Sequence, residues 1–201
     1  MYQFETILFT VESGIAVVTL NRQEALNALN LHMMGDIKSA MDIVESDKNI
    51  KALVITGAGR AFCSGQDLRN RPPQSTDIVT ALMEGYFPTL QAVKNSSVPV
   101  VTAVNGVAAG AGCAFALLGD LTIAGESASF IQVFSRIGLA PDLGSTYLLP
   151  RLIGRSRALK MMLTNESISA RKALQWGMIS ACVDDKKLIE TAIGRAQLLT
   201  A

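Results

Sequence analysis

The chain has 201 residues, of which 49% are hydrophobic and 17% are charged, and its formal net charge is +1. A chain of this length and composition can bury a core of its own, so intrinsic disorder and a disulfide-stapled miniprotein are excluded. The near-neutral charge argues against a nucleic-acid-binding surface, and we therefore expect no nucleic-acid partner.

The predicted elements alternate between strands and helices, as apolar periodicity and turn residues indicate. In the first half they are strands at 7–10 and 15–20, a helix at 31–44, a strand at 51–56, a loop at 69–77, a helix at 78–93 and a strand at 98–104. In the second half they are a helix after 112, a strand at 120–124, helices from 155 and at 168–176, a strand at 179–183 and a helix at 187–201. This alternation predicts an α/β fold.

The most apolar stretch, residues 98–118, is long enough to raise the question of a membrane span. Pro99, Asn105 and glycines at 106, 110 and 112 interrupt it, which predicts a strand, a turn and a helix start instead. We therefore expect no membrane partner. The three cysteines are far apart and odd in number, with no metal-binding spacing, which favours a reducing cytoplasm.

Several well-known functional motifs are incomplete or missing in the sequence. The run Gly110-Ala111-Gly112 lacks the third glycine of the dinucleotide-binding fingerprint, which argues against a nicotinamide-dependent enzyme. His32 is the only histidine and lies in a predicted helix. A single histidine in a helix is more often an ordinary surface or core residue than a catalytic one. We therefore predict no metal site.

Two glycine-rich turns, at 57–67 and 105–113, each follow a predicted strand. Small residues allow a backbone to approach a ligand closely, and the N–H groups at a helix start have no partner within the helix. Two such turns side by side can direct two N–H donors at one oxygen atom. Tight packing of helix on strand is the alternative explanation.

Together with residues 25–29, 120–124, Phe130, Gly138-Leu139 and Leu163-Thr164, these turns resemble the crotonase (enoyl-CoA hydratase/isomerase) superfamily over essentially the whole chain. The resemblance implies one domain over 1–201, folded as a spiral of ββα units. In this family a C-terminal helical segment normally follows, so the resemblance implies a fold truncated there, with 185–201 as the start of that segment. It also implies acyl-CoA thioester substrates, no further cofactor, and a homo-trimer or dimer of trimers.

By the same resemblance, the backbone N–H groups of Gln66 and Ala111 form an oxyanion hole for the thioester oxygen. The residues placed at the substrate and coenzyme A are Arg22, Ala25, Ser64, Gly65, Gln66, Asp67, Leu68, Gly110 and Ala111. Arg60, Arg69 and Arg71 also lie near the predicted coenzyme A entrance, although each is more simply explained as solvated charge. Asp67 and Asp120 are interpreted as structural, because such carboxylates commonly accept bonds from backbone N–H groups.

The family's hydratases use two glutamates, and the matching positions here hold Ala114 and Phe134, which cannot move a proton. Asp142, between apolar neighbours, is the remaining candidate. An apolar pocket raises the pKa of a carboxyl, which suits a group that takes a proton from one carbon and returns it to another. The pattern therefore favours an isomerase, similar to dienoyl-CoA isomerases and the ring-epoxide isomerase of phenylacetate breakdown.

Three alternatives stay open. Asp142 could simply cap a helix that begins near Leu143. The protein could be a hydratase that uses an unrecognised carboxylate, or a coenzyme A-binding or assembly protein without activity. The apolar face of the last helix (Leu188, Ile189, Ala192, Ile193 and Ala196) has nothing after it in the sequence to cover it, so we expect an exposed apolar surface and an oligomer.

Overall fold

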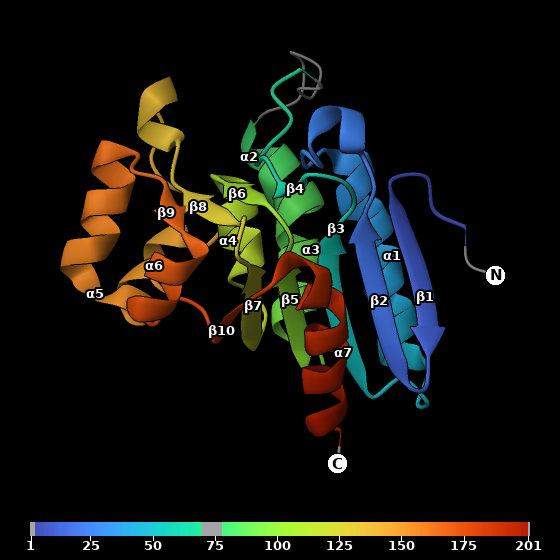
Figure 1. Cartoon of the computed structure of the whole chain (residues 1–201). Helices are drawn as coiled ribbons and strands as arrows, with labels where there is room; N and C mark the ends of the chain where they lie inside the picture. The colour runs from blue at the N-terminus through green and yellow to red at the C-terminus, as the bar shows by residue number, and fades with distance from the viewer. Residues whose placement is uncertain (1–2, 70–77, 201) are drawn as a thin grey trace.

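A computed structural model describes residues 3–69 and 78–200 and shows two sheets surrounded by helices (Figure 1). The larger sheet has six strands in the order β1-β2-β3-β5-β7-β10, and only the β1–β2 pair is antiparallel. Its strands are β1 (Ile7–Glu12), β2 (Ile15–Leu20), β3 (Ala52–Gly57), β5 (Val100–Val104), β7 (Leu121–Gly125) and β10 (Ala181–Val183). The α/β class predicted from the sequence is confirmed.

A smaller sheet runs beside the first, in the order β4-β6-β8-β9. Its strands are β4 (Ala61–Cys63), β6 (Val107–Ala109), β8 (Ser129–Ile131) and β9 (Ile168–Ser169). Successive strands of the chain alternate between the sheets: β3 is followed by β4, β5 by β6 and β7 by β8. A helical segment then leads to the next pair, so the chain forms the expected spiral of ββα units.

The helices follow the predicted order with shifted ends. They are α1 (Leu31–Ser46), α2 (Ile78–Thr80), a π-helical turn (Ala81–Tyr86), α3 (Phe87–Lys94), α4 (Ala111–Ala116), α5 (Ser145–Thr164), α6 (Ala170–Gln175) and α7 (Leu188–Leu198). The helix expected from residue 155 is the second part of α5: Gly154 (φ 77°, ψ 157°) is not helical and divides α5 into two helical parts, of which the first, from Ser145, was not predicted. The loop predicted at 69–77 falls, after residue 69, outside the described residues.

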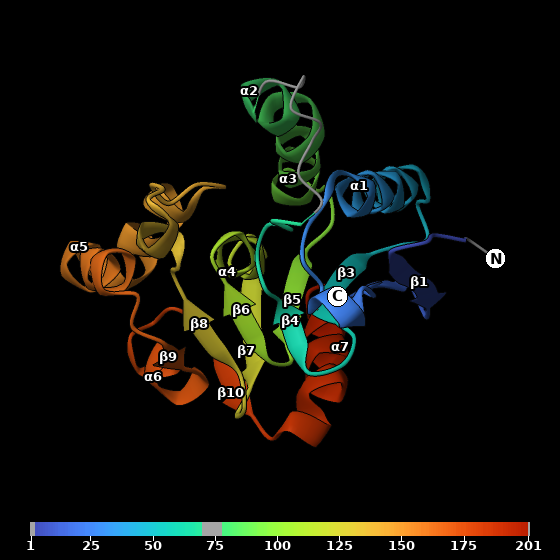
Figure 2. The same ribbon diagram turned by 90° about the horizontal axis from the view of Figure 1, so that it is seen from above.

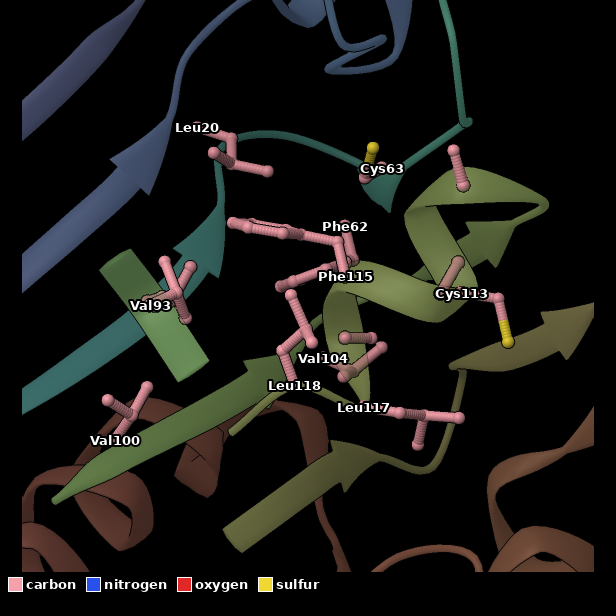
Figure 3. Close-up of a cluster of buried hydrophobic side chains, with 14 of the residues drawn as sticks. Leu20, Phe62, Cys63, Val93, Val100, Val104, Cys113, Phe115, Leu117 and Leu118 are labelled. Carbon is pink, nitrogen blue, oxygen red and sulfur yellow. The ribbon is translucent and has the colours of Figure 1, made fainter. Parts of the chain in front are cut away.

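Helices α1, α3 and α4 pack on one face of the large sheet, as the view from above shows (Figure 2). Helix α1 begins where the Asn30 side chain accepts a hydrogen bond from the N–H of Met33 (2.8 Å). Its apolar stripe is buried in the main core, in which Phe62 and Phe115 lie between the sheet and α4 (Figure 3). This core fixes the strand ends from which the two glycine-rich turns emerge.

Helix α7 covers the opposite face of the same sheet (Figure 2). Its Leu188, Ala192 and Ala196 are fully buried in a second cluster. The sheet contributes Ile15, Ala52, Val54, Val101, Ala103 and Ile123 to that cluster. The expectation that the apolar face of this helix is uncovered is therefore wrong, because the sheet itself buries it; only Ile189, at 39% exposure, remains open.

No helix in the described part of the chain is long and apolar enough to cross a membrane. The apolar run at 98–118 forms β5, β6, α4 and the turns between them, as its proline and glycines predicted.

Candidate active site

The two glycine-rich turns lie against each other. Gly65 has φ +101°, and a Cβ atom built on it would come within 2.8 Å of the carbonyl oxygen of Ala109 and 3.6 Å of the amide nitrogen of Ala111. A Cβ on Gly112 would overlap the carbonyl of Cys63. Only glycine permits this approach of the two backbones. The sequence therefore places the amides of 66 and 111 on neighbouring segments.

Neither of the two predicted oxyanion donors, the N–H groups of Gln66 and Ala111, is hydrogen-bonded to a described residue. Leu29 forms a parallel bridge with Gln66, in which the Leu29 N–H donates to the oxygen of Gly65 (2.8 Å) and the Asp67 N–H donates to the oxygen of Leu29 (2.8 Å). This pattern turns the Gln66 N–H away from the bridge. Ala111 is the first residue of α4, where the N–H points out of the helix.

Alanine at position 111 is compatible with this geometry. Ala111 is not among the non-glycine residues with positive φ, and its side chain is 3% exposed. The preceding Gly110 takes the unusual backbone conformation (φ 53°, ψ −120°) that lets the turn enter the helix. The donor is a backbone group, so the methyl group leaves it in place.

A cavity of about 460 Å³ opens beside Gln66. Its wall contains six of the residues expected to contact coenzyme A or substrate: Arg22, Ala25, Ser64, Gln66, Asp67 and Leu68. Glu24, Leu26, Ala28 and Arg69 complete the lining. Gly65, Gly110 and Ala111 lie in the turns rather than on this wall, Arg60 is exposed and outside the lining, and Arg71 falls outside the described residues.

Arg22 holds the wall of this cavity together. Its guanidinium pairs with Asp67 (2.8 Å) and donates to the carbonyl oxygen of Ala28 (2.6 Å). Asp67 also accepts from the N–H of Arg69 (3.0 Å), and Asp120 accepts from the N–H of Val100 (2.9 Å). The structural roles expected for the two aspartates are confirmed, and Arg22 contributes to the shape of the site through this ion pair.

Asn27 is an organising residue that sequence reasoning gave no role. It is fully buried at φ 55°, and its side-chain amide donates to the carbonyl oxygens of Ala58 (2.9 Å) and Ala61 (2.8 Å). Its side-chain oxygen accepts from the N–H of Arg22 (2.9 Å). Asn27 thus fixes the 22–29 segment to the turn between β3 and β4. The signal in the sequence was an asparagine between apolar residues, which alone does not reveal its partners.

Asp142 lies in the wall of a second, larger cavity of about 620 Å³. Apolar side chains dominate this cavity, contributed by the π-helical turn, α3 and the start of α5: Leu82, Met83, Phe87, Leu90, Leu118, Leu143, Tyr147 and Leu148. Oδ1 of Asp142 is buried and has no hydrogen-bond partner within residues 3–69 and 78–200. Burial raises the pKa of this carboxyl.

The alternative reading of Asp142 as a helix cap is wrong. Helix α5 starts at Ser145 with Gly144 as its N-cap, and no described side chain caps it. Asp142 participates only through its backbone oxygen, which accepts from the N–H of Ser145 (2.9 Å). Its carboxyl is therefore available to the cavity.

The two positions that hold glutamates in the family's hydratases are closed and apolar. Ala114 is 1% exposed and Phe134 is 6% exposed. Phe134 lies beside the second turn, because a Cβ on Gly110 would sit 3.7 Å from its ring. Neither side chain carries a group that can transfer a proton.

Tyr86, at the end of the π-helical turn, was also missed by sequence reasoning. It is 3% exposed, and its hydroxyl donates to the carbonyl oxygen of Leu29 (3.1 Å). Burial raises its pKa, a hydrogen bond with the Gln66 side chain lowers it, and the charges of Asp67 and Asp142 raise it again. The charges of Asp67, in the wall of the smaller cavity, and of Asp142, in the wall of the larger one, thus both act on this hydroxyl.

The two buried thiols do not supply a nucleophile at neutral pH. Burial raises the pKa of Cys63 and of Cys113 to about 12, which keeps both protonated. Within the described residues, no group of three or more histidine, cysteine, aspartate or glutamate side chains could hold a metal ion. Of the groups predicted from the sequence, the two backbone donors and the Asp142 carboxyl remain the candidates for chemistry.

Paired backbone donors beside a cavity on a ββα spiral are the features of a crotonase-type acyl-thioester protein, and comparison with known proteins agrees. The sequence model of the family "Enoyl-CoA hydratase/isomerase" matches residues 10–201. The chain therefore belongs to the enoyl-CoA hydratase/isomerase family, whose members act on acyl-CoA substrates.

Individual relatives are similar over most of the chain. A 1,2-epoxyphenylacetyl-CoA isomerase of Escherichia coli is 45% identical over 94% of this chain and 73% of its own length. A probable enoyl-CoA hydratase of Rhodobacter capsulatus is also 45% identical, over 90% of this chain and 70% of its own. The crystal structure of an enoyl-CoA hydratase from Bacillus anthracis superposes with a TM-score of 0.92 at 31% identity, covering 97% of this chain and 76% of its own.

Proposed function

We propose that the protein is an acyl-CoA isomerase in which Asp142 moves the proton and the N–H groups of Gln66 and Ala111 stabilise the enolate. The ionised carboxylate removes a proton from the carbon next to the thioester carbonyl. The electron pair moves onto the thioester oxygen, where the two N–H donors hold the negative charge. When the carbonyl re-forms, the double bond shifts and the carboxyl returns the proton to a carbon further along the chain. The steps balance without water, a redox carrier or a metal ion, so the proposal needs no cofactor.

The observation that carries this proposal is the carboxyl of Asp142 in the wall of the apolar cavity, where its buried Oδ1 has no hydrogen-bond partner among the described residues. The two positions that hold glutamates in the family's hydratases, Ala114 and Phe134, are buried and apolar. An apolar surrounding that raises the pKa makes one carboxyl effective both as a base and, after it has taken the proton, as an acid. Hydration requires one group that activates a water molecule and one that delivers a proton, and two separate side chains commonly do this. A single carboxyl favours proton transfer within one substrate molecule.

The decisive variant is Asp142→Asn, which keeps the shape of the side chain and removes the base. We expect double-bond migration, followed by chromatography of cis- and trans-3-enoyl-CoA substrates, to fall about 10²- to 10⁴-fold. Binding of a saturated acyl-CoA should change little, since the two N–H donors remain. Near-wild-type isomerisation by this variant would refute the assignment.

A hydratase is the second candidate, because the relative from Rhodobacter capsulatus that carries that description is as similar as the isomerase. Addition of water to crotonyl-CoA measures it directly. Hydration at a rate equal to or above that of isomerisation would favour this candidate. Tight binding of acyl-CoA with no turnover of any substrate tested would favour a binding protein without activity.

We also infer a homo-trimer or a dimer of trimers, in the cytoplasm. Exposed apolar side chains support the oligomer; they include Tyr147 and Leu163 on α5, and Ile137 and Leu139 before it. Three free cysteines support a reducing compartment. Light scattering of the purified protein tests the assembly, and a monodisperse monomer would contradict it. Fractionation of the producing cells tests the location.

A further inference from the structure

We propose that Tyr86 is a positioning residue that orients the Gln66 oxyanion donor through the carbonyl group of Leu29. This inference rests on the proposed role of the Gln66 N–H and names a side chain that controls it. Tyr86 does not touch the site of the reacting atoms. It acts on the peptide that carries the donor.

The first step of the argument is the bridge between Leu29 and the donor segment. The Leu29 N–H and carbonyl oxygen hold Gly65 and Asp67, the residues on either side of Gln66, each at 2.8 Å. The two peptide units around Gln66 are thereby fixed by one residue of the neighbouring segment. Any rotation of the Leu29 carbonyl changes the direction of the Gln66 N–H.

The second step is what holds the Leu29 carbonyl. This oxygen accepts two hydrogen bonds, from the N–H of Asp67 and from the hydroxyl of Tyr86 (3.1 Å). The Tyr86 hydroxyl also hydrogen-bonds the side chain of Gln66, so one buried group contacts both partners of the bridge. Because the hydroxyl is out of water, its loss is not compensated by solvent.

The third step is how Tyr86 reaches this position. Residues 81–86 form a π-helical turn between α2 and α3, and Tyr86 is its last residue. An extra residue in the turn rotates everything that follows about the helix axis. Gly85 permits the close approach to α1, because a Cβ atom there would overlap the side chain of Leu31. The turn therefore points Tyr86 inward, toward Leu29, while Met83 and Phe87 face the larger cavity.

The test compares Tyr86→Phe with Thr89→Val. Thr89 lies on α3 and is equally buried, and its hydroxyl donates to the carbonyl oxygen of Met34 (2.9 Å) in α1, away from both cavities. Each variant removes one buried hydroxyl from the same helical segment with little change of shape. The two should therefore lose similar thermal stability, and only Tyr86→Phe should affect the donor.

The main readout needs no turnover. The 201-residue protein is mixed with hexanoyl-CoA labelled with ¹³C at the thioester carbonyl, a saturated thioester that cannot be isomerised or hydrated. Difference infrared spectroscopy then reports how strongly the donors polarise the carbonyl. In the wild type we expect its stretch to move to lower frequency on binding. Tyr86→Phe should lose about half of that shift, with kcat for 3-enoyl-CoA reduced about tenfold and KM nearly unchanged, whereas Thr89→Val should match the wild type in all three.

Each other outcome overturns the proposal. A full carbonyl shift in Tyr86→Phe, or an equal loss in Thr89→Val, means that Tyr86 supports only the fold. Absence of a shift in the wild type refutes the oxyanion role of Gln66 itself, and the positioning role with it. If Tyr86→Phe does not fold, Gln66→Leu keeps the backbone donor and removes the side-chain bond to Tyr86. A partial loss of the shift in that variant supports the proposal, and a full shift overturns it.

Discussion

The two sides of the candidate site are built in opposite ways. On the side of residues 57–67 and 105–113, the groups proposed for chemistry lie in the backbone, which is held by glycines, buried amides and an ion pair. On the side of α3 and the start of α5, the wall is apolar and the proposed group is one side chain, Asp142. In the proposed function, the first side holds the thioester oxygen and the second acts on the rest of the substrate.

The largest effect on activity is expected from one methyl group added to the glycine-rich turn at 57–67. Gly65→Ala places a Cβ at φ +101° and 2.8 Å from the oxygen of Ala109, so the turn must move. We expect kcat/KM for 3-enoyl-CoA to fall about 10²- to 10³-fold, as when an oxyanion donor is lost.

The matched control for this glycine is Gly35→Ala. Position 35 lies in α1, and a Cβ there would meet no atom of the described chain within 4 Å. Activity should be unchanged and stability should rise by about 0.5–1 kcal/mol, because alanine favours helix. Equal activities of Gly65→Ala and the wild type would show that the turn geometry does not matter.

Asn27→Ala tests how much the buried hydrogen bonds of Asn27 to the glycine-rich turn at 57–67 contribute to the stability of the protein. The change leaves the carbonyl oxygens of Ala58 and Ala61 without this donor and puts alanine at φ 55°. We expect a loss of about 2–3 kcal/mol in the free energy of unfolding, measured by urea titration. Asn49→Ala, at an exposed turn, should change it by less than about 0.5 kcal/mol; equal losses in both variants would contradict the prediction.

The smallest expected effect is a change with pH in the stability of the folded protein that is caused by the Asp142 carboxyl. The pKa of Asp142 is raised in the folded protein above its ordinary value of 3.8, so folding favours the protonated form. This contribution is complete below about 3.8 and is lost as the pH rises through the folded pKa. Asp142→Asn should therefore be more stable than the wild type at pH 7, with the difference shrinking toward pH 3 in thermal melts. A less stable variant at pH 7 would show that the ionised carboxylate supports the fold.

Local signals in the sequence predicted the α/β class and the two glycine-rich turns, whereas the spiral of ββα units was implied by the resemblance to the family. An apolar strand that ends at a glycine can be recognised in the sequence without knowledge of the elements that pack against it. The role of α7 was mispredicted because the partner of its apolar face, the back of the sheet, is set by topology rather than by neighbours in sequence. Asn27 and Tyr86 were missed for the same reason, since their partners lie 31 to 57 residues away.

The position of α7 also bears on how the protein forms during translation. Residues 188–198 follow every strand in the sequence, yet they cover the back of β3, β5 and β7. Until they leave the ribosome, that surface of alanine, valine and isoleucine side chains has nothing from this helix to shield it. Parallel strands with a bare apolar face are prone to associate with other chains, so the nascent protein passes through an aggregation-sensitive stage that ends when the helix docks.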